Sequence, residues 1–274
     1  MKFNRYIFIV FFASLTLFGN TASAHPSNNN AFITTSSGNK IGVGSPATQK
    51  VSPFIILPKE TIKEKKDARI KQSITVLPST SSTVVEIPFS FYNDEYLVLY
   101  KEDSGKQYNA GHIFNKKNES IGLFFISTEK AQNKLKVTTN VKNKNILELK
   151  IETNKLLDPV TIDIEISSPD ITTYFSKNQW ITRGKLDSVS MIPSPYLLTS
   201  ANYEISTLKR LDAWNKLVDL HKYDEKWSNI SGLQNQFDCH FDFAKTKGEW
   251  NLEPARKNVG YFSTIMASCN PSTK

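Results

Sequence analysis

The sequence has few of the residues that build metal centres and thiol active sites. It contains two cysteines and four histidines among 274 residues. The histidines are His25, His112, His221 and His240, and no two of them have the spacing of metal ligands. We therefore predict neither a metal site nor a cofactor. No apolar run after the N-terminal segment approaches 18 residues, so we expect no transmembrane segment.

The N-terminal segment, 1–24, has the pattern of a secretory signal peptide. Lys2 and Arg5 precede an apolar run over 6–18, which is too short for a spanning helix. The run is followed by Thr21-Ala-Ser-Ala24, with small residues at the two positions that signal peptidases read. We therefore predict cleavage between Ala24 and His25 and a secreted, extracellular protein.

Basic residues outnumber acidic ones. Of the 34 Lys and Arg side chains, 32 remain once Lys2 and Arg5 are removed, against 26 acidic ones, a net charge of +6. Six of them gather within 59–71, which is either a solvated tail or a site of attachment to an anionic envelope polymer or lipid surface. Nucleic acid is not an expected partner, because an exported protein is separated from the nucleic acid of the cell. No nucleic-acid recognition motif accompanies the basic residues either.

The two cysteines, Cys239 and Cys269, are expected to form one disulfide. An exported chain meets an oxidising compartment, and two cysteines there most simply pair with each other. The alternative is a nucleophilic Cys239 beside His240, which requires a free thiolate. A disulfide with Cys269 would leave Cys239 without a free thiolate, so we favour the bridge.

Composition divides the mature chain into three parts. The range 25–71 is rich in Ser, Thr, Asn, Gly and Lys and poor in aromatics, which predicts a flexible leader. Short β-rich runs at regular spacing over 72–168 predict an antiparallel sandwich. Those runs are 74–77, 84–91, 96–100, 111–114, 121–126, 135–139, 146–151 and 160–166.

The range 170–274 mixes both element types. The runs 180–183 and 189–192 have the pattern of strands, and a near-helical apolar period after Ser206 predicts a helix over about 207–221. The segment 237–243 fits either a strand or a helix, and the absence of β-branched residues favours the helix. The predicted fold is α+β overall: an N-terminal all-β antiparallel sandwich followed by a small α+β, disulfide-bridged domain.

The last part of the chain also carries a specific block of motifs. Cys239-His240, a Trp-Asn-Leu-Glu-Pro run and Cys269-Asn-Pro occur together and in order, and they resemble the bacterial family known as domain of unknown function 2599 over about 90 residues. The preceding β-rich part looks like the N-terminal part of longer members from Gram-positive bacteria. The resemblance implies a secreted, disulfide-bearing domain and brings no established activity. The motif residues are Trp180, Arg183, Gln236, Trp250, Asn251, Leu252, Glu253 and Pro254.

The residue types suited to catalysis are His240, Glu253 and Arg256. A histidine held by a carboxylate, here Asp238 or Asp242, is a possible general base, and an arginine would hold an anionic substrate. The alternative is that Glu253 and Arg256 pair with each other and that His240 is structural. Because no nucleophile motif accompanies them, the leading hypothesis is a non-catalytic protein that binds an anionic cell-wall polymer or a partner protein. The alternative is a small secreted hydrolase or toxin with its site around these three residues.

Overall fold

The fold is described here from a computed structural model. It describes residues 31–35, 38–48, 54–57, 62–64, 69–102, 104–128, 134–153, 155–200 and 202–273. The expected signal peptide, with the cleavage site at Ala24 and His25, lies outside these residues. Within them the chain is α+β, as the sequence predicts, and it has antiparallel sheets and five helices. No helix among the described residues has the length and apolar character needed to cross a membrane.

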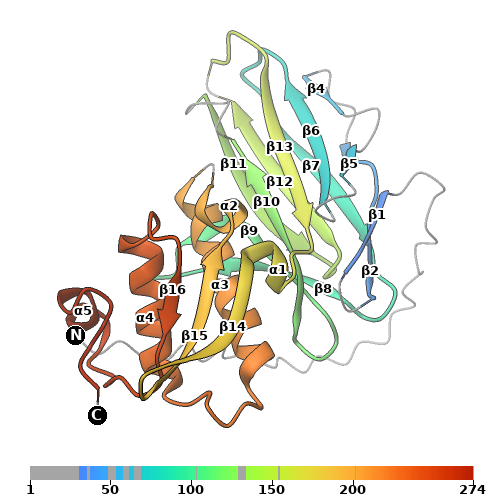
Figure 1. Ribbon diagram of the computed structural model, residues 1–274. Coiled ribbons are helices and arrows are strands. Elements are labelled where there is room, and N and C mark those ends of the chain that lie inside the picture. The colour runs from blue at the N-terminus through green and yellow to red at the C-terminus, as the bar shows by residue number, and fades with distance from the viewer. Residues whose placement is uncertain are drawn as a thin grey trace.

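Two antiparallel sheets form a β-sandwich, at the upper right of Figure 1. One sheet has the order β1-β2-β7-β12-β11, with β3 also paired to β7, and the other has the order β4-β6-β13-β10-β9-β8, with β5 also paired to β6. The first sheet comprises β1 (Ala31–Thr34), β2 (Lys40–Val43), β3 (Ala47–Thr48), β7 (Ser82–Ser90), β12 (Ile146–Thr153) and β11 (Leu135–Lys142). The second comprises β4 (Ile55–Ile56), β5 (Ile62–Glu64), β6 (Arg69–Val76), β13 (Val160–Ser167), β10 (Ser120–Ser127), β9 (Gln107–Phe114) and β8 (Tyr96–Lys101).

Alternating side chains build the core between these sheets. In β13, Ile162, Ile164 and Ile166 are fully buried, while the residues between them lie on the other face. Since successive residues of a strand point to opposite faces, this alternation leaves one face apolar. The same core receives Ile87 from β7 and Leu149 from β12, so both sheets contribute to it.

The range 25–71 differs from the expected flexible leader. Its described residues include β1 to β5, and Ile33, Ile41 and Val43 are buried in the sandwich core. Composition averaged over the whole range hid these short apolar patches. Such short strands form because an existing strand supplies their hydrogen-bond partners: β7 pairs with β2, which has four residues, and with β3, which has two.

The C-terminal region contains a third sheet and most of the helices, at the lower left of Figure 1. Its sheet has the order β14-β15-β16. These strands are β14 (Phe175–Arg183), β15 (Leu186–Pro193) and β16 (Trp250–Leu252), and the helices are α1 (Ile171–Tyr174), α2 (Pro195–Leu198), α3 (Tyr203–His221), α4 (Ile230–Phe243) and α5 (Tyr261–Met266). The segment 237–243 lies in α4, so the helical alternative is confirmed.

Helix α3 begins earlier than the sequence indicated. The expected cap was Ser206, but the Asn202 side chain accepts a hydrogen bond of 2.9 Å from the backbone N–H of Ile205. Asparagine is as good an N-cap as serine, and it lies upstream, so the helix starts at Tyr203. Four additional residues thereby enter the helix, and Ile205 among them is buried against the sandwich.

The sandwich and the C-terminal region share an apolar contact. Leu123 and Phe125 of β10 and Tyr108 of β9 form one buried cluster with Ile205 and Leu208 of α3. Strand β10 therefore has apolar neighbours on both faces, which explains its nearly unbroken apolar sequence. Figure 1 shows α3 lying between this sheet and the rest of the C-terminal region.

Candidate functional site

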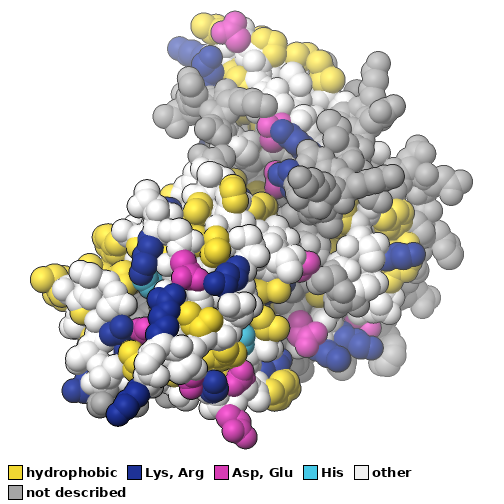
Figure 2. Space-filling model, in the orientation of Figure 1, with side chains coloured by type: hydrophobic (Ala, Val, Ile, Leu, Met, Phe, Trp, Pro, Cys, Tyr) yellow, Lys and Arg dark blue, Asp and Glu magenta, His cyan; other side chains and the backbone are white. Residues whose placement is uncertain are grey.

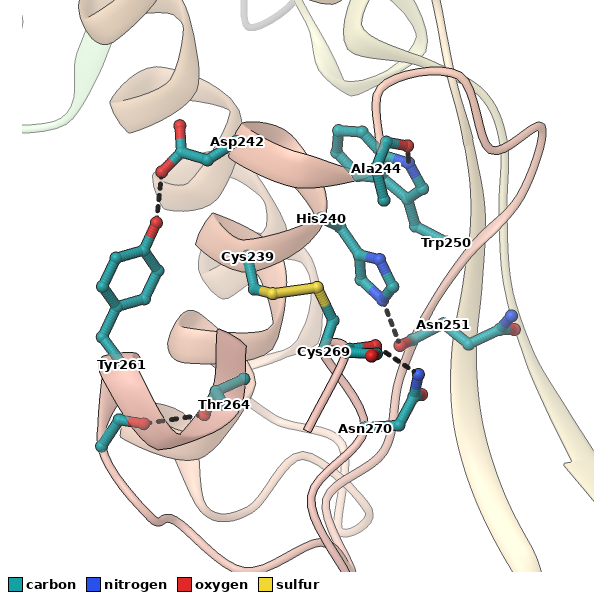
Figure 3. The surroundings of a disulfide bond; sticks show 12 residues. Cys239, His240, Asp242, Ala244, Trp250, Asn251, Tyr261, Thr264, Cys269 and Asn270 are labelled. Carbon is teal, nitrogen blue, oxygen red and sulfur yellow. Dashed lines mark hydrogen bonds between the residues drawn. A yellow bond between two sulfur atoms is a disulfide. The ribbon is translucent and has the colours of Figure 1, made fainter. Parts of the chain in front are cut away.

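The disulfide lies at the centre of the motif-bearing region. Cys239 of α4 and Cys269, which follows α5, are bonded, with their Cα atoms 5.5 Å apart. Both are buried, and no described cysteine is free. The expected bridge is confirmed, and with it the thiol role for Cys239 is ruled out in the folded chain. Figure 3 shows the bond joining α4 to the segment that leaves α5.

His240 is buried behind the disulfide and only 1% exposed. Its Nε2 lies 3.3 Å from the backbone carbonyl oxygen of Asn251, which can only accept, so Nε2 carries the proton. The ring stacks on Trp250, with centroids 5.9 Å apart. Burial, helped by the nearby charge of Lys247, lowers the pKa of His240 to about 4. The imidazole is therefore neutral at physiological pH, and Figure 3 shows it directed at the Asn251 backbone, whose side chain points away.

Glu253 and Arg256 pair with each other. The Arg256 Nε donates to Glu253 Oε2, and the Arg256 Nη1 donates to the carbonyl of Pro271 at 2.6 Å. The backbone of Glu253 is held in turn by the Gln236 side chain, which accepts from its N–H at 2.9 Å and donates to its C=O at 3.1 Å. These bonds connect α4, the end of β16 and the C-terminal tail, so they hold in place the loop over 253–256 that follows β16.

The three candidate residues are thus placed in two separate sets of contacts. His240 contacts Asn251 and Trp250, whereas Glu253 and Arg256 contact each other, Gln236 and Pro271. Asp238 and Asp242, the proposed orienting carboxylates, both lie against Arg210. Two of the open surface depressions in the described part of the chain are lined by residues on the sandwich side, within 39–119 and 54–157.

The remaining motif residues build the third sheet and its core. Trp250 is fully buried, and its Nε1 donates to the carbonyl of Ala244 at 3.1 Å. Leu252 is fully buried beside Val189, its partner in the sheet. Trp180 packs edge-on against His221 and Trp227. The Trp-Asn-Leu-Glu-Pro run therefore supplies β16, an edge strand that completes the sheet.

The outer face of this sheet carries a charge cluster that the sequence analysis missed. The Glu249 carboxylate accepts from Lys177 Nζ at 2.8 Å, from Arg183 Nη2 at 2.9 Å and from the hydroxyl of Ser190. The hydrogen bond from Lys177, followed by that from Ser190, lowers the pKa of Glu249 to about 2. Lys177 and Arg183 stand six positions apart in β14, hence on one face. The alternation of side chains along β14 could have shown that Lys177 and Arg183 share a face. No local pattern in the sequence indicated that Glu249 pairs with them.

A second missed cluster surrounds Asp212 of α3, which is 1% exposed. Its carboxylate accepts from Ser120 Oγ of β10 at 2.9 Å and from the Tyr174 hydroxyl at 2.7 Å, and Lys216 Nζ lies at 3.8 Å. Ser120 also lies 3.0 Å from His112 Nδ1, and because the serine donates to Asp212 it accepts from His112. The Ser120 hydroxyl therefore links the His112 ring to the Asp212 carboxylate through two hydrogen bonds. The cluster is a buried polar contact between the sandwich and α3.

No arrangement for a metal ion was found in the described ranges: they contain no group of three or more His, Cys, Asp or Glu side chains placed to hold one. What the described residues do provide is a surface cluster of Lys177, Arg183 and Glu249 in the same region as the Cys239–Cys269 disulfide. Its chemistry suits ionic and hydrogen-bonded recognition of another molecule.

Comparison with known families agrees with the motif block. Residues 175–272 match the family described as "Protein of unknown function (DUF2599)". The match begins with the first residue of β14 and includes the whole third sheet, α2 to α5 and the disulfide. The C-terminal region is therefore similar to that family, as the sequence motifs indicated. No curated protein matches the sequence.

Proposed function

We propose that the protein is a secreted, non-catalytic binding protein that attaches to an anionic polymer of a Gram-positive cell envelope. The disulfide supports an oxidising, extracellular compartment. The observation that carries the proposal is the outer face of the third sheet. There the side chains of Lys177 and Arg183 are 35% and 55% exposed, and both ion-pair with one carboxylate, that of Glu249.

The charge balance of this face favours an anionic ligand. Two cations share one anion, so the cluster has a net positive charge. An arginine and a lysine together have more N–H donors than a carboxylate has lone pairs. A phosphate or carboxylate group of a polymer would therefore find donors that Glu249 does not occupy. Because both cations project from one strand of a paired sheet, their separation is fixed before binding.

The test is retention of the mature chain, from His25 onward, on purified cell walls over a series of salt concentrations. We expect retention that falls as salt rises, because surface charge is screened. The double variant Lys177→Ala/Arg183→Ala should lose most of it. Glu249→Gln should increase it, because the internal competitor loses its charge.

A matched control removes two lysines elsewhere. Lys136 and Lys150, in β11 and β12 of the sandwich, are also exposed and each ion-pair with Glu152. Lys136→Ala/Lys150→Ala changes the net charge by the same amount, so it should reduce retention less than the variant at β14. Equal effects of the two double variants would mean that net charge alone drives attachment. Absence of wall binding by the wild type at low salt would refute the proposal.

The hydrolase or toxin hypothesis gains no support from the geometry. It requires His240, Glu253 and Arg256 to converge on an accessible hollow, and in the described residues they make separate internal contacts. A histidine with a pKa of about 4 is also a weak base. The binding function is therefore the one that the arrangement favours.

A further inference from the structure

One of the surface depressions on the sandwich, called here the loop depression, lies among three loops. These loops connect β1 to β2, β7 to β8 and β9 to β10, so both sheets contribute to it at one end of the sandwich. Its volume is about 360 Å³, within the range of about 300–1,000 Å³ that is usual for small-molecule sites. It is lined by Asn39, Asn93, Asn115, Lys116, Lys117 and Glu119.

The lining of the loop depression is entirely polar. Its six side chains are three amides, two ammonium groups and one carboxylate. An amide both donates and accepts hydrogen bonds, whereas an ammonium group only donates and a carboxylate only accepts. Figure 2 shows basic and acidic side chains next to one another at the lower right, below the place where Figure 1 draws β8, so this part of the surface does not carry a single sign of charge. The lining therefore suits a ligand whose groups are donors and acceptors at once.

Hydrogen bonds within two of the loops fix the shape of the depression. The Glu95 carboxylate, which is 4% exposed, accepts from the backbone N–H groups of Tyr92 and Asn93 at 2.9 and 2.6 Å. The Asn115 Oδ1 accepts from two backbone N–H groups of its own loop at 2.9 and 3.0 Å. The depression is thus formed before a ligand arrives, which reduces the conformational entropy lost on binding.

Contacts between these loops and their neighbours hold them together as well. The Tyr96 hydroxyl of β8 donates to Asn118 Oδ1, in the loop between β9 and β10, at 2.5 Å. The ring of Tyr92 packs against Phe32 of β1, with centroids 6.0 Å apart. Tyr92 directly precedes the lining residue Asn93 and is 53% exposed. A sugar presents apolar C–H groups as well as hydroxyl groups, so an exposed aromatic ring next to a lining residue in the chain suits it.

We propose that the loop depression binds an oligosaccharide, with the asparagine amides and Glu119 bonding its hydroxyl groups. A hydroxyl group both donates and accepts, which matches this lining. A lipid or another apolar ligand would require apolar walls. A divalent cation fits poorly, because two lysines would repel it and one carboxylate supplies too few oxygen ligands. A protein partner would cover about 800 Å² of this surface, and a depression lined by six side chains offers much less.

The test is binding of the mature chain, from His25 onward, to a printed array of neutral and acidic oligosaccharides, followed by calorimetric titration with the oligosaccharide that binds best. We expect binding to neutral oligosaccharides that hardly changes at high salt, because salt screens exposed charges and not hydrogen bonds to uncharged hydroxyl groups. Asn93 and Lys116 are exposed, so replacing them should leave the fold intact. The variant Asn93→Ala/Lys116→Ala should bind about tenfold more weakly, since it removes two hydrogen-bonding groups from the lining.

The matched control removes the same two kinds of side chain elsewhere on the sandwich. Lys136 and Asn140 of β11 are also exposed, so Lys136→Ala/Asn140→Ala should bind like the wild type. Unchanged urea unfolding curves would confirm that both double variants are folded. Wild type that binds no neutral oligosaccharide, binding that disappears at high salt, or equal losses in both double variants would overturn the proposal.

A further variant separates this site from the face proposed to bind walls. Lys177→Ala/Arg183→Ala changes only side chains of β14, so it should bind oligosaccharides as the wild type does. If this variant lost oligosaccharide binding, the sugar would bind at the third sheet, and the proposal for the loop depression would be wrong. Loss of wall retention with unchanged oligosaccharide binding would support two independent sites.

Discussion

Asp212 offers the most direct test of how the sandwich and the C-terminal region are held together. Asp212→Ala would leave the buried Tyr174 hydroxyl without its acceptor and Lys216 without its nearest carboxylate. Ser120 would keep only its bond with His112. An unsatisfied buried donor costs about 1–3 kcal/mol, and loss of the countercharge adds to it, so we expect unfolding free energy to fall by about 3 kcal/mol. Asp212→Asn keeps an acceptor oxygen and should cost about 1 kcal/mol.

The assay uses the placement of the tryptophans. All four lie in the C-terminal region, at Trp180, Trp214, Trp227 and Trp250. Indole fluorescence during urea unfolding therefore reports on that region, while hydrogen exchange of the backbone amides of β6 and β13, pulsed at each urea concentration and read by mass spectrometry, reports on the sandwich. We expect the two transitions to coincide in the wild type and to separate in Asp212→Ala, because the polar contact between the two regions is lost.

A matched control is available on the same helix. Asp219 is exposed and pairs at the surface with Lys222, so Asp219→Ala should hardly change the unfolding curve. Our reasoning would be refuted if Asp212→Ala cost no more stability than Asp219→Ala. It would also be refuted if the cost were large while the two transitions still coincided, because Asp212 would then support one cooperative unit and not a junction between two.

Four further outcomes follow from the structure. Labelling of the unfolded, unreduced chain should find no free thiol, and Cys239→Ser/Cys269→Ser should lower stability by about 3–4 kcal/mol for a loop of this length. The folded pKa of His240 is about 4, below the ordinary value of about 6.5, so protonation favours the unfolded chain. The free energy of unfolding should therefore fall between about pH 6.5 and pH 4, by at most about 3 kcal/mol. His240→Gln should remove this pH-dependent loss of stability in urea unfolding measured over the same pH range. Arg256→Ala should lower the unfolding free energy by about 1–3 kcal/mol in the same assay, through its lost bonds to a buried carboxylate and a carbonyl. Mild native proteolysis followed by mass spectrometry should leave residues 31–48 bound to the sandwich, whereas a flexible leader over 25–71 would be removed first.

Elements with strong local patterns were predictable. The alternation of isoleucines over 160–166 indicated a half-buried strand, and α4 followed from its apolar spacing and lack of β-branched residues. The disulfide followed from the number of cysteines and the expected compartment. In each case the information lies within a few neighbouring positions or in a composition that allows one simple pairing.

Elements that depend on distant partners were not predictable. Strand β2 has four residues, and what makes it a strand is its place between β1 and β7, which its own sequence does not encode. The Glu249 site joins residues 72 positions apart. Asp212, in a helix with lysines nearby, has the pattern of an exposed charge, yet its partners Ser120 and Tyr174 come from other elements and make it a buried one.

The position of β16 has a consequence for the order in which the protein can fold as the chain is synthesised. Strand β15 ends at Pro193, but β16, its outer partner, begins at Trp250, and Cys269 comes later still. The strands of the sandwich pair only with one another, and the last of them, β13, ends at Ser167. A chain that leaves the ribosome N-terminus first can therefore complete the sandwich while the third sheet still lacks its edge strand β16. The C-terminal region therefore closes last, because β16 and Cys269 are the last parts to become available, and it closes on a sandwich that is already folded and offers Leu123 and Phe125 to α3.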